Sequence, residues 1–257
     1  MSNKDIVTNE YSLLFGDCLE RMKEIPDGSV DAIICDPPYG IVSCGWDSVI
    51  PFEPMWEQLK RIIKPNGAIV LFSSQPFTSV LITSNLKMYR YNWVWVKHAP
   101  TNFATANRMP MKYHEDICVF YKKQPTYNKQ MIPRTGSGSE RTKYKVSRTK
   151  SEHIELGKKD VQYSKDLKNP STVLYYNGVY KNTILHPTQK PVALLEYLIK
   201  TYTNECETVL DFTFGSCSTG VACLNTNRKF LGVEMDEGYF DVGVKRMQES
   251  TIKGEIK

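Results

Sequence analysis

Hydrophobic residues along the chain form short strand-like runs that alternate with amphipathic, helix-like segments. Apolar runs bounded by turn residues predict strands, and apolar positions three and four apart predict helices. The predicted strands cover residues 12–16, 30–35, 67–73, 92–97, 115–122, 207–213 and 229–235. The predicted helices cover residues 18–25, 53–63, 76–86, 191–202, 218–226 and 237–249. The alternation predicts an α/β protein with a doubly wound, mostly parallel sheet.

The alternation stops between residues 123 and 185, where Gly, Ser, Lys, Arg, Asn and Tyr replace the periodic pattern. From Lys122 to Leu185 the chain has 14 Lys and Arg against 5 Asp and Glu, whereas the formal charge of the whole chain is only +5. Clustered cations with interleaved tyrosines are typical of phosphate contact and base stacking. The segment is therefore either an inserted polyanion-binding region or a solvated loop.

The overall composition is that of a cytoplasmic globular protein. Hydrophobic residues make up 41% of the chain and charged residues 24%, and no apolar run is long enough to span a membrane. The first residues lack the pattern of a signal peptide. The seven cysteines never form C-x-x-C, and the four histidines lack ligand spacing, so we expect neither a disulfide framework nor a bound metal.

The predicted strand 30–35 ends abruptly in Asp36-Pro37-Pro38-Tyr39. Each proline fixes φ and lacks a backbone N–H, so the chain can neither continue the sheet nor begin a helix at once. The result is a stiff segment with a carboxylate before it and an aromatic ring after it. This segment is either a strand terminator or a rigid active-site loop.

A second candidate site is the turn after the predicted strand 207–213, within the run Val209 to Gly220. Its spacing G-x-C-x-x-G is a dinucleotide-binding fingerprint with cysteine at the middle glycine, and Glu234 follows at the distance of a ribose-binding acid. Asp211 would repel a pyrophosphate but suits a cationic sulfonium. The turn therefore favours S-adenosylmethionine (SAM) over NAD.

These residues resemble a known family, the SAM-dependent amino-methylating DNA methyltransferases. Asp36-Pro37-Pro38-Tyr39 looks like their catalytic motif, and Val209 to Gly220 looks like their cofactor motif. The catalytic motif comes first, which is the permuted order of the beta group. Gly16-Asp17 followed by Leu19-Glu20, and the run His186 to Pro191, resemble two further motifs of that group.

The resemblance implies a circularly permuted, Rossmann-like, seven-stranded mixed sheet. Its order would be 12–16, 229–235, 207–213, 30–35 and 67–73, followed by an edge of 92–97 and 115–122 that contains antiparallel pairing. Residues 1–122 and 186–257 would form one methyltransferase domain, and residues 123–185 a basic target-recognition insertion. Asp36 and Asp211 would meet at the carboxyl ends of adjacent strands, where such sheets bind ligands.

The resemblance also implies a mechanism. Asp36 and the carbonyl of Pro37 would accept the two hydrogens of an exocyclic base amine, Pro38 would keep the loop stiff, and Tyr39 would stack on a base flipped out of the duplex. The implied cofactor is SAM, and the implied partner is double-stranded DNA bound through residues 123–185. A homodimer and a cognate restriction nuclease are further candidate partners.

The family pattern assigns cofactor contacts residue by residue. The implied contacts are Asp17 near the adenine, Glu234 at the ribose, Thr188 and Lys190 near the carboxylate, and Asp211, Phe212, Phe214, Gly215, Ser216 and Ser218 around the methionine part. This chain departs from the pattern with Phe212 and Thr213 after the aspartate and with Cys217 at the second glycine. A side chain at position 217 could crowd the cofactor.

The leading hypothesis is a DNA adenine-N6 methyltransferase, because Asp rather than Ser at position 36 leans towards adenine. Cytosine-N4 methylation stays open, since both amines present the same two hydrogens. Methylation of RNA or of a protein amide fits the basic insertion and the motif order less well. A DNA-binding protein with a degenerate cofactor site is a further alternative, supported only by Cys217. An NAD-dependent dehydrogenase is the most distant alternative, because the sequence has no catalytic acid–base pair beside the glycine loop.

Overall fold

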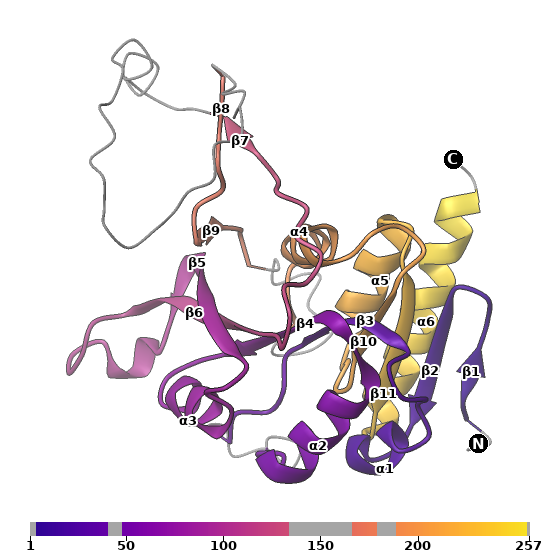
Figure 1. Ribbon diagram of the computed structural model, residues 1–257. Helices are drawn as coiled ribbons and strands as arrows, with labels where there is room; N and C mark the ends of the chain where they lie inside the picture. The colour runs from indigo at the N-terminus through magenta and orange to yellow at the C-terminus, as the bar shows by residue number, and fades with distance from the viewer. Residues whose placement is uncertain (1–3, 41–47, 134–165, 179–188, 256–257) are drawn as a thin grey trace. The chain divides into compact units, whose positions relative to one another are not determined.

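The computed structural model describes residues 4–40, 48–133, 166–178 and 189–255 (Figure 1). Contacts divide the chain into two compact units, Met1–Asn128 with Thr172–Lys257, and Lys129–Ser171. Within the second unit, strands β7 (Ile132–Pro133) and β8 (Leu167–Lys168) pair antiparallel. The predicted insertion 123–185 lies largely outside the described residues.

The first unit is built around one nine-stranded sheet in the order β1-β2-β11-β10-β3-β4-β6-β5-β9. Its strands are β1 (Ile6–Val7), β2 (Tyr11–Phe15), β3 (Val30–Cys35), β4 (Ile63–Ser73), β5 (Tyr89–Thr101), β6 (Lys112–Phe120), β9 (Val173–Tyr175), β10 (Thr208–Asp211) and β11 (Lys229–Glu234). Strands β2, β11, β10, β3 and β4 are parallel, and β6 is antiparallel to both β4 and β5. The predicted α/β fold and its strand order are confirmed.

The strand count of seven is wrong, because β1 and β9 extend the two edges of the sheet. β1 has two residues and β9 has three, too few to show an alternating pattern in the sequence. β4 also begins at Ile63, directly after a helix and before the Pro65-Asn66-Gly67 signal for a turn. A register shift between its pairings to Val30 and to Ala32 accommodates this irregular start.

Helices cover both faces of the sheet (Figure 1). They are α1 (Cys18–Met22), α2 (Phe52–Ile62), α3 (Phe77–Ser84), α4 (Val192–Tyr202), α5 (Ser218–Asn225) and α6 (Glu237–Glu255), and a short 3-10 turn, η1 (Phe103–Thr105), follows β5. Side chains of α1, α2 and α3 join one buried cluster, and those of α4, α5 and α6 join another. Successive residues of β3 alternate between them: Ile33 faces the first cluster and Ile34 the second.

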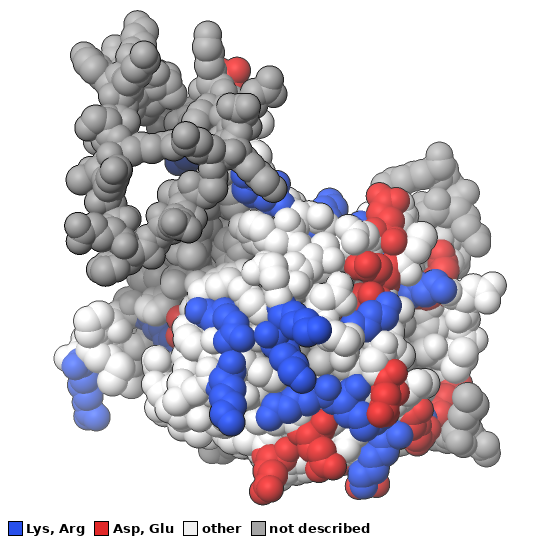
Figure 2. Space-filling model, viewed as in Figure 1, with Lys and Arg blue, Asp and Glu red and all other residues white. Residues whose placement is uncertain are grey.

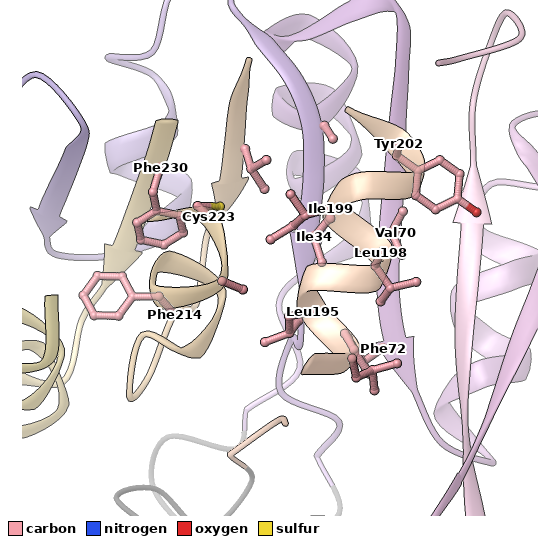
Figure 3. Close-up of a cluster of buried hydrophobic side chains, with 14 of the residues drawn as sticks. Ile34, Val70, Phe72, Leu195, Leu198, Ile199, Tyr202, Phe214, Cys223 and Phe230 are labelled. Atoms are coloured by element: carbon pink, nitrogen blue, oxygen red, sulfur yellow. The ribbon is translucent and has the colours of Figure 1, made fainter. Parts of the chain in front are cut away.

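Helix α4 packs over the middle of the sheet (Figure 3). Leu195, Leu198 and Ile199 are at most 2% exposed and lie against the side chains of Ile34 and Val70. At the end of the same helix, the Tyr202 hydroxyl accepts a hydrogen bond from Trp93 Nε1 and shares one with the Tyr91 hydroxyl, each at 2.7 Å. The helix that follows the Lys190 region is therefore fixed by both apolar packing and buried hydrogen bonds.

Helices that could cross a membrane were sought within the described part of the chain. No helix there is both long and apolar enough to do so.

Candidate active site

A cavity of about 370 Å³ opens at the carboxyl ends of the parallel strands. The loops after β2, β3, β10 and β11 line it, together with the start of α5 and residues 48–51. Its volume lies within the range of roughly 300–1,000 Å³ that is usual for small-molecule and cofactor sites. In open α/β sheets, ligands bind at this edge, next to the position where the order of the strands reverses.

The two loops that carry the motifs are bonded to each other. The Thr213 hydroxyl donates to the backbone carbonyl of Asp36 at 3.2 Å and lies 3.0 Å from the Cys35 thiol. Because Thr213 follows β10 and Asp36 follows β3, this contact joins the ends of two adjacent parallel strands. Asp36 and Asp211 lie 175 positions apart in the sequence, yet they line one cavity.

The Asp36 carboxylate is held by two donors of the protein itself. Tyr39 donates its hydroxyl hydrogen to Asp36 Oδ1 at 2.5 Å, while its ring stacks on Phe77 with centroids 5.0 Å apart. Lys190 forms an ion pair with Oδ2. Burial raises the pKa of Asp36, and the nearby Lys190 ammonium opposes this rise without cancelling it.

Lys190 also approaches a second carboxylate, that of Glu115 at the middle of β6. The distance from Lys190 Nζ to Glu115 Oε2 is 3.7 Å, and Lys97 pairs with the other oxygen of Glu115. Burial alone would raise the pKa of Glu115, but the two lysines outweigh it and lower the pKa. Likewise, the two carboxylates outweigh the burial of Lys190 and raise its pKa.

The glycine loop holds Asp211 with neutral donors. Thr219 donates its hydroxyl to Asp211 Oδ2 at 2.6 Å, and the Thr213 backbone N–H donates to Oδ1 at 3.2 Å. Burial nevertheless raises the pKa of Asp211 to about 6. Gly215 turns the chain with φ of +51°, a left-handed conformation that glycine adopts without steric cost.

Glu234, at the end of β11, fastens the glycine loop to the neighbouring strand. Its Oε2 accepts the Gly215 N–H at 2.8 Å, and its Oε1 accepts the N–H groups of Met235 and Asp236 at 2.9 and 2.8 Å. Burial raises the pKa of Glu234, although these hydrogen bonds oppose the rise. The carboxylate therefore shapes the loop in addition to lining the cavity.

Cys217 does not crowd the cavity, contrary to the expectation from its place in the motif. Its side chain is fully buried in the core and is absent from the cavity lining. Its Sγ lies only 2.6 Å from where a Cβ on Gly220 would be. Cys217 has φ of +58°, so it occupies the left-handed conformation that a glycine would otherwise provide.

Asp17 has a structural role at the start of α1. Its carboxylate caps α1 by accepting the N–H groups of Leu19 and Glu20 at 2.9 and 3.2 Å, and the residue lines the cavity as well. Asp17 thus stands at a helix N-terminus with its side chain already engaged by two backbone donors.

Of the predicted site residues, all but Thr188 lie in the cavity wall. They are Asp17, Asp36, Pro37, Pro38, Tyr39, Lys190, Asp211, Phe212, Phe214, Gly215, Ser216, Ser218 and Glu234. Thr188 lies outside the described residues. The Lys190 ammonium is ion-paired with Asp36, and its contact with the cofactor carboxylate stays a prediction.

Several residues at the site were not among the predicted site residues. Thr213 joins the two loops, Phe72 lies 5.1 Å from the Lys190 ammonium, and Glu115 pairs with Lys190. Of these, Glu115 had a recognisable signal: it is a charged residue in a strand whose last four positions are buried. That signal does not reveal the partner, which comes from a distant segment.

The comparisons with known proteins point to one family. The model of the N6/N4-methyltransferase family, described as DNA methylase, matches residues 30–245. The chain belongs to this family.

The relatives of this DNA methylase match it over most of its length. The type II methyltransferase M.HpaI of Haemophilus parainfluenzae is 27% identical over 255 residues, which cover 93% of this chain and 74% of that protein. The DNA adenine methyltransferase YhdJ of Escherichia coli K12 is 27% identical over 254 residues, covering 92% and 82%. The crystal structure of the M1.HpyAVI–SAM complex is 25% identical with a TM-score of 0.62, covering 92% and 99%.

Proposed function

We propose that this DNA methylase transfers a methyl group from SAM to the N6 amine of adenine in DNA. The observation that carries the proposal is that the Asp36 and Asp211 loops are hydrogen-bonded to each other and line one cavity. One loop has the residues suited to a base amine and the other those suited to a cationic cofactor. The M1.HpyAVI structure contains SAM, and YhdJ is named as an adenine methyltransferase.

The lining of the cavity suits SAM in charge and polarity. Four carboxylate residues line it, which suits a ligand with a sulfonium and an ammonium group; they are Asp17, Asp36, Asp211 and Glu234. Apolar side chains of Phe212, Phe214 and Ile50 line the remainder and suit an adenine ring. We assign Asp17 to the adenine end, Glu234 to the ribose, and Asp211 with Gly215, Ser216 and Ser218 to the methionine part.

Bound SAM supplies an electrophilic methyl group, whose bond to sulfur breaks as its bond to N6 forms. Asp36 and the Pro37 carbonyl accept the amine hydrogens, which turns the nitrogen lone pair towards the methyl carbon. Asp36 then takes up the proton that N6 loses. Pro37 and Pro38 keep these acceptors in place, where small displacements would slow the reaction strongly. Because a base inside the duplex cannot reach this depth, the adenine must be flipped out, and Tyr39 lies beside Asp36 to receive it.

We assign DNA contact to the basic residues 123–185 and to the hairpin that joins β5 and β6. Figure 1 shows this hairpin extending from the sheet. Residues 98–114 contain Arg108, Lys112 and two histidines but no Asp or Glu, and Phe103 at the tip is 80% exposed. Over α1 and α2, by contrast, basic side chains stand beside acidic ones (Figure 2), as in the Lys23–Glu20 pair at 2.8 Å.

The test of this function compares acceptors. The purified protein is incubated with methyl-labelled SAM and, in parallel, unmethylated duplex DNA, RNA of matched length or denatured protein. We expect label in DNA only. Label in RNA or protein, or SAM binding without transfer to any acceptor, would refute the proposal.

A further inference from the structure

Four charged, mostly buried side chains form a continuous row that begins in the cavity wall and runs towards β5. In order they are Lys97 on β5, Glu115 on β6, Lys190 before α4, and Asp36 after β3, and adjacent members are ion-paired. Their side chains are 14%, 14%, 8% and 20% exposed. Since two cations alternate with two anions, the row is neutral overall, and a shift of Lys190 within it changes no net charge.

The two carboxylates that flank Lys190 are satisfied unequally. Both oxygens of Asp36 have protein donors, Tyr39 on Oδ1 and Lys190 on Oδ2. Glu115 Oε2, in contrast, is a buried oxygen without a hydrogen-bond partner among the described residues, and it lies 3.7 Å from Lys190 Nζ. A buried acceptor that lacks a hydrogen bond is unfavourable, so the structure contains a second, partly used position for the Lys190 ammonium.

Reaching that position takes little movement. A shift of Lys190 Nζ by about 1 Å would bring it within hydrogen-bond distance of Glu115 Oε2. The lysine stem is flexible and its ammonium has three donors, so the change needs no rearrangement of the backbone. The same movement lengthens the contact with Asp36 Oδ2, and a further swing of the stem towards Glu115 would leave that oxygen available to a base amine.

We propose that Lys190 alternates between Asp36 and Glu115, and that Glu115 is a positioning residue that draws Lys190 away when Asp36 accepts the adenine amine. This inference rests on the proposed function and assigns a role to Glu115 within it. When Lys190 is paired with Asp36, its ammonium favours the ionised form of the carboxylate but occupies Oδ2. With Lys190 on Glu115, Asp36 is open to the amine and is a stronger proton acceptor, because its nearest cation has moved away.

The protonation states support the exchange. Burial acts against the charge on Lys190, but Asp36 and Glu115 together raise its pKa, so it stays an ammonium at neutral pH. The pKa of Glu115 is lowered, so it stays a carboxylate. Both partners of the second position are therefore charged whenever the enzyme is working.

The test is a double-mutant cycle on Glu115→Gln and Lys190→Met. Single-turnover transfer from saturating labelled SAM to unmethylated genomic DNA gives the rate, and calorimetry gives the SAM dissociation constant. We expect Glu115→Gln to slow transfer by about tenfold with unchanged SAM affinity. In the Lys190→Met background the same substitution should have almost no effect, because Glu115 acts through Lys190.

A conservative variant separates charge from packing. Glu115→Asp keeps the charge but shortens the side chain, whereas Glu115→Gln keeps the shape and loses the charge. We expect the Asp variant to retain more of the rate; a purely structural Glu115 would favour the Gln variant. The matched control is Lys64→Met, which removes another lysine–aspartate ion pair. Lys64 Nζ on β4 lies 2.6 Å from Asp31 Oδ1 on β3, and neither residue lines the cavity. We expect this variant to have the wild-type rate.

Three results would overturn the inference: a wild-type rate in Glu115→Gln, an equal effect of Glu115→Gln in both backgrounds, or a large loss of SAM affinity in Lys190→Met. The last would place Lys190 at the cofactor. Failure of the proposed function looks different. The unmodified enzyme would then transfer no methyl group to adenine in DNA, and the inference would fall with the proposed function.

Discussion

Asp36 and Asp211 end neighbouring strands, but their carboxylates have different partners. Asp36 is paired with the Lys190 ammonium, whereas the hydrogen bonds described for Asp211 come from the Thr219 hydroxyl and the Thr213 N–H. Burial raises the pKa of both, and for Asp211 it reaches about 6. The carboxylate that we propose to face the cationic cofactor therefore has a pKa just below neutral pH.

The affinity for SAM should therefore fall as the pH drops from 7 to 5. Below about pH 6 the free protein holds a proton on Asp211, and that proton must leave before the carboxylate can attract the cationic cofactor. Each pH unit below the pKa should weaken binding by up to about tenfold. Calorimetric titration across this range measures the effect. Asp211→Asn should bind weakly with a flatter profile, and equal wild-type affinity at pH 7 and pH 5 would disprove the role of Asp211.

At the scale of elements, the glycine loop depends on close packing behind it. A Cβ on Gly220 would lie 2.6 Å from Cys217 Sγ and 2.7 Å from Met247 Sδ. Cys217 itself is in the left-handed region and fully buried. The first turn of α5 is thus packed between the glycine loop and α6. This packing fixes the orientation of Ser218 and Thr219, which line the cavity.

Gly220→Ala should lower stability and weaken SAM binding together. Overpacking a buried position typically costs about 1–3 kcal/mol, and the displaced turn carries Ser218 and Thr219. Thermal unfolding and calorimetry measure the two effects. Gly178→Ala is the control, because a Cβ there meets no atom within 4 Å. A Gly220→Ala variant with wild-type melting temperature would contradict this packing.

The β5–β6 hairpin gives a prediction about DNA. Phe103→Ala should reduce DNA affinity by about tenfold if its ring stacks on a base. Arg108→Ala should reduce the salt dependence of binding by about one phosphate contact. Fluorescence anisotropy with duplex DNA at several salt concentrations measures both. Leu86→Ala, at a residue 62% exposed outside the hairpin, is the control, and equal DNA affinity of all four proteins would remove the hairpin from the interface.

At the scale of the whole molecule, the motifs predicted more of the fold and of the site than the hydrophobic periodicity did. Periodicity located the main helices and strands, but the strand order came from the resemblance, because nothing local places residues 207–213 beside 30–35. The thirteen described site residues were found because they fall within motifs. Glu115 and Thr213 were not among the predicted site residues, because their contacts are with partners that folding brings near.

The edges of the sheet and the DNA sequence recognised were beyond prediction for physical reasons. The strands β1 and β9 are too short to show a period, and their pairing depends on the sheet that is already present. Sequence recognition rests on a few groove contacts whose geometry a basic, low-complexity segment does not specify. The division of the chain into a methyltransferase domain and a recognition insertion at 123–185 stays a prediction.

The most direct measurement identifies the methylated base and its dependence on Asp36. Unmethylated duplex DNA is treated with labelled SAM and either the wild-type protein or Asp36→Ala, then digested to nucleosides and separated. We predict labelled N6-methyladenosine with the wild type, and none with Asp36→Ala although that variant still binds SAM. Labelled N4-methylcytidine would contradict the assignment to adenine, and full activity of Asp36→Ala would contradict the role of the carboxylate on which the mechanism depends.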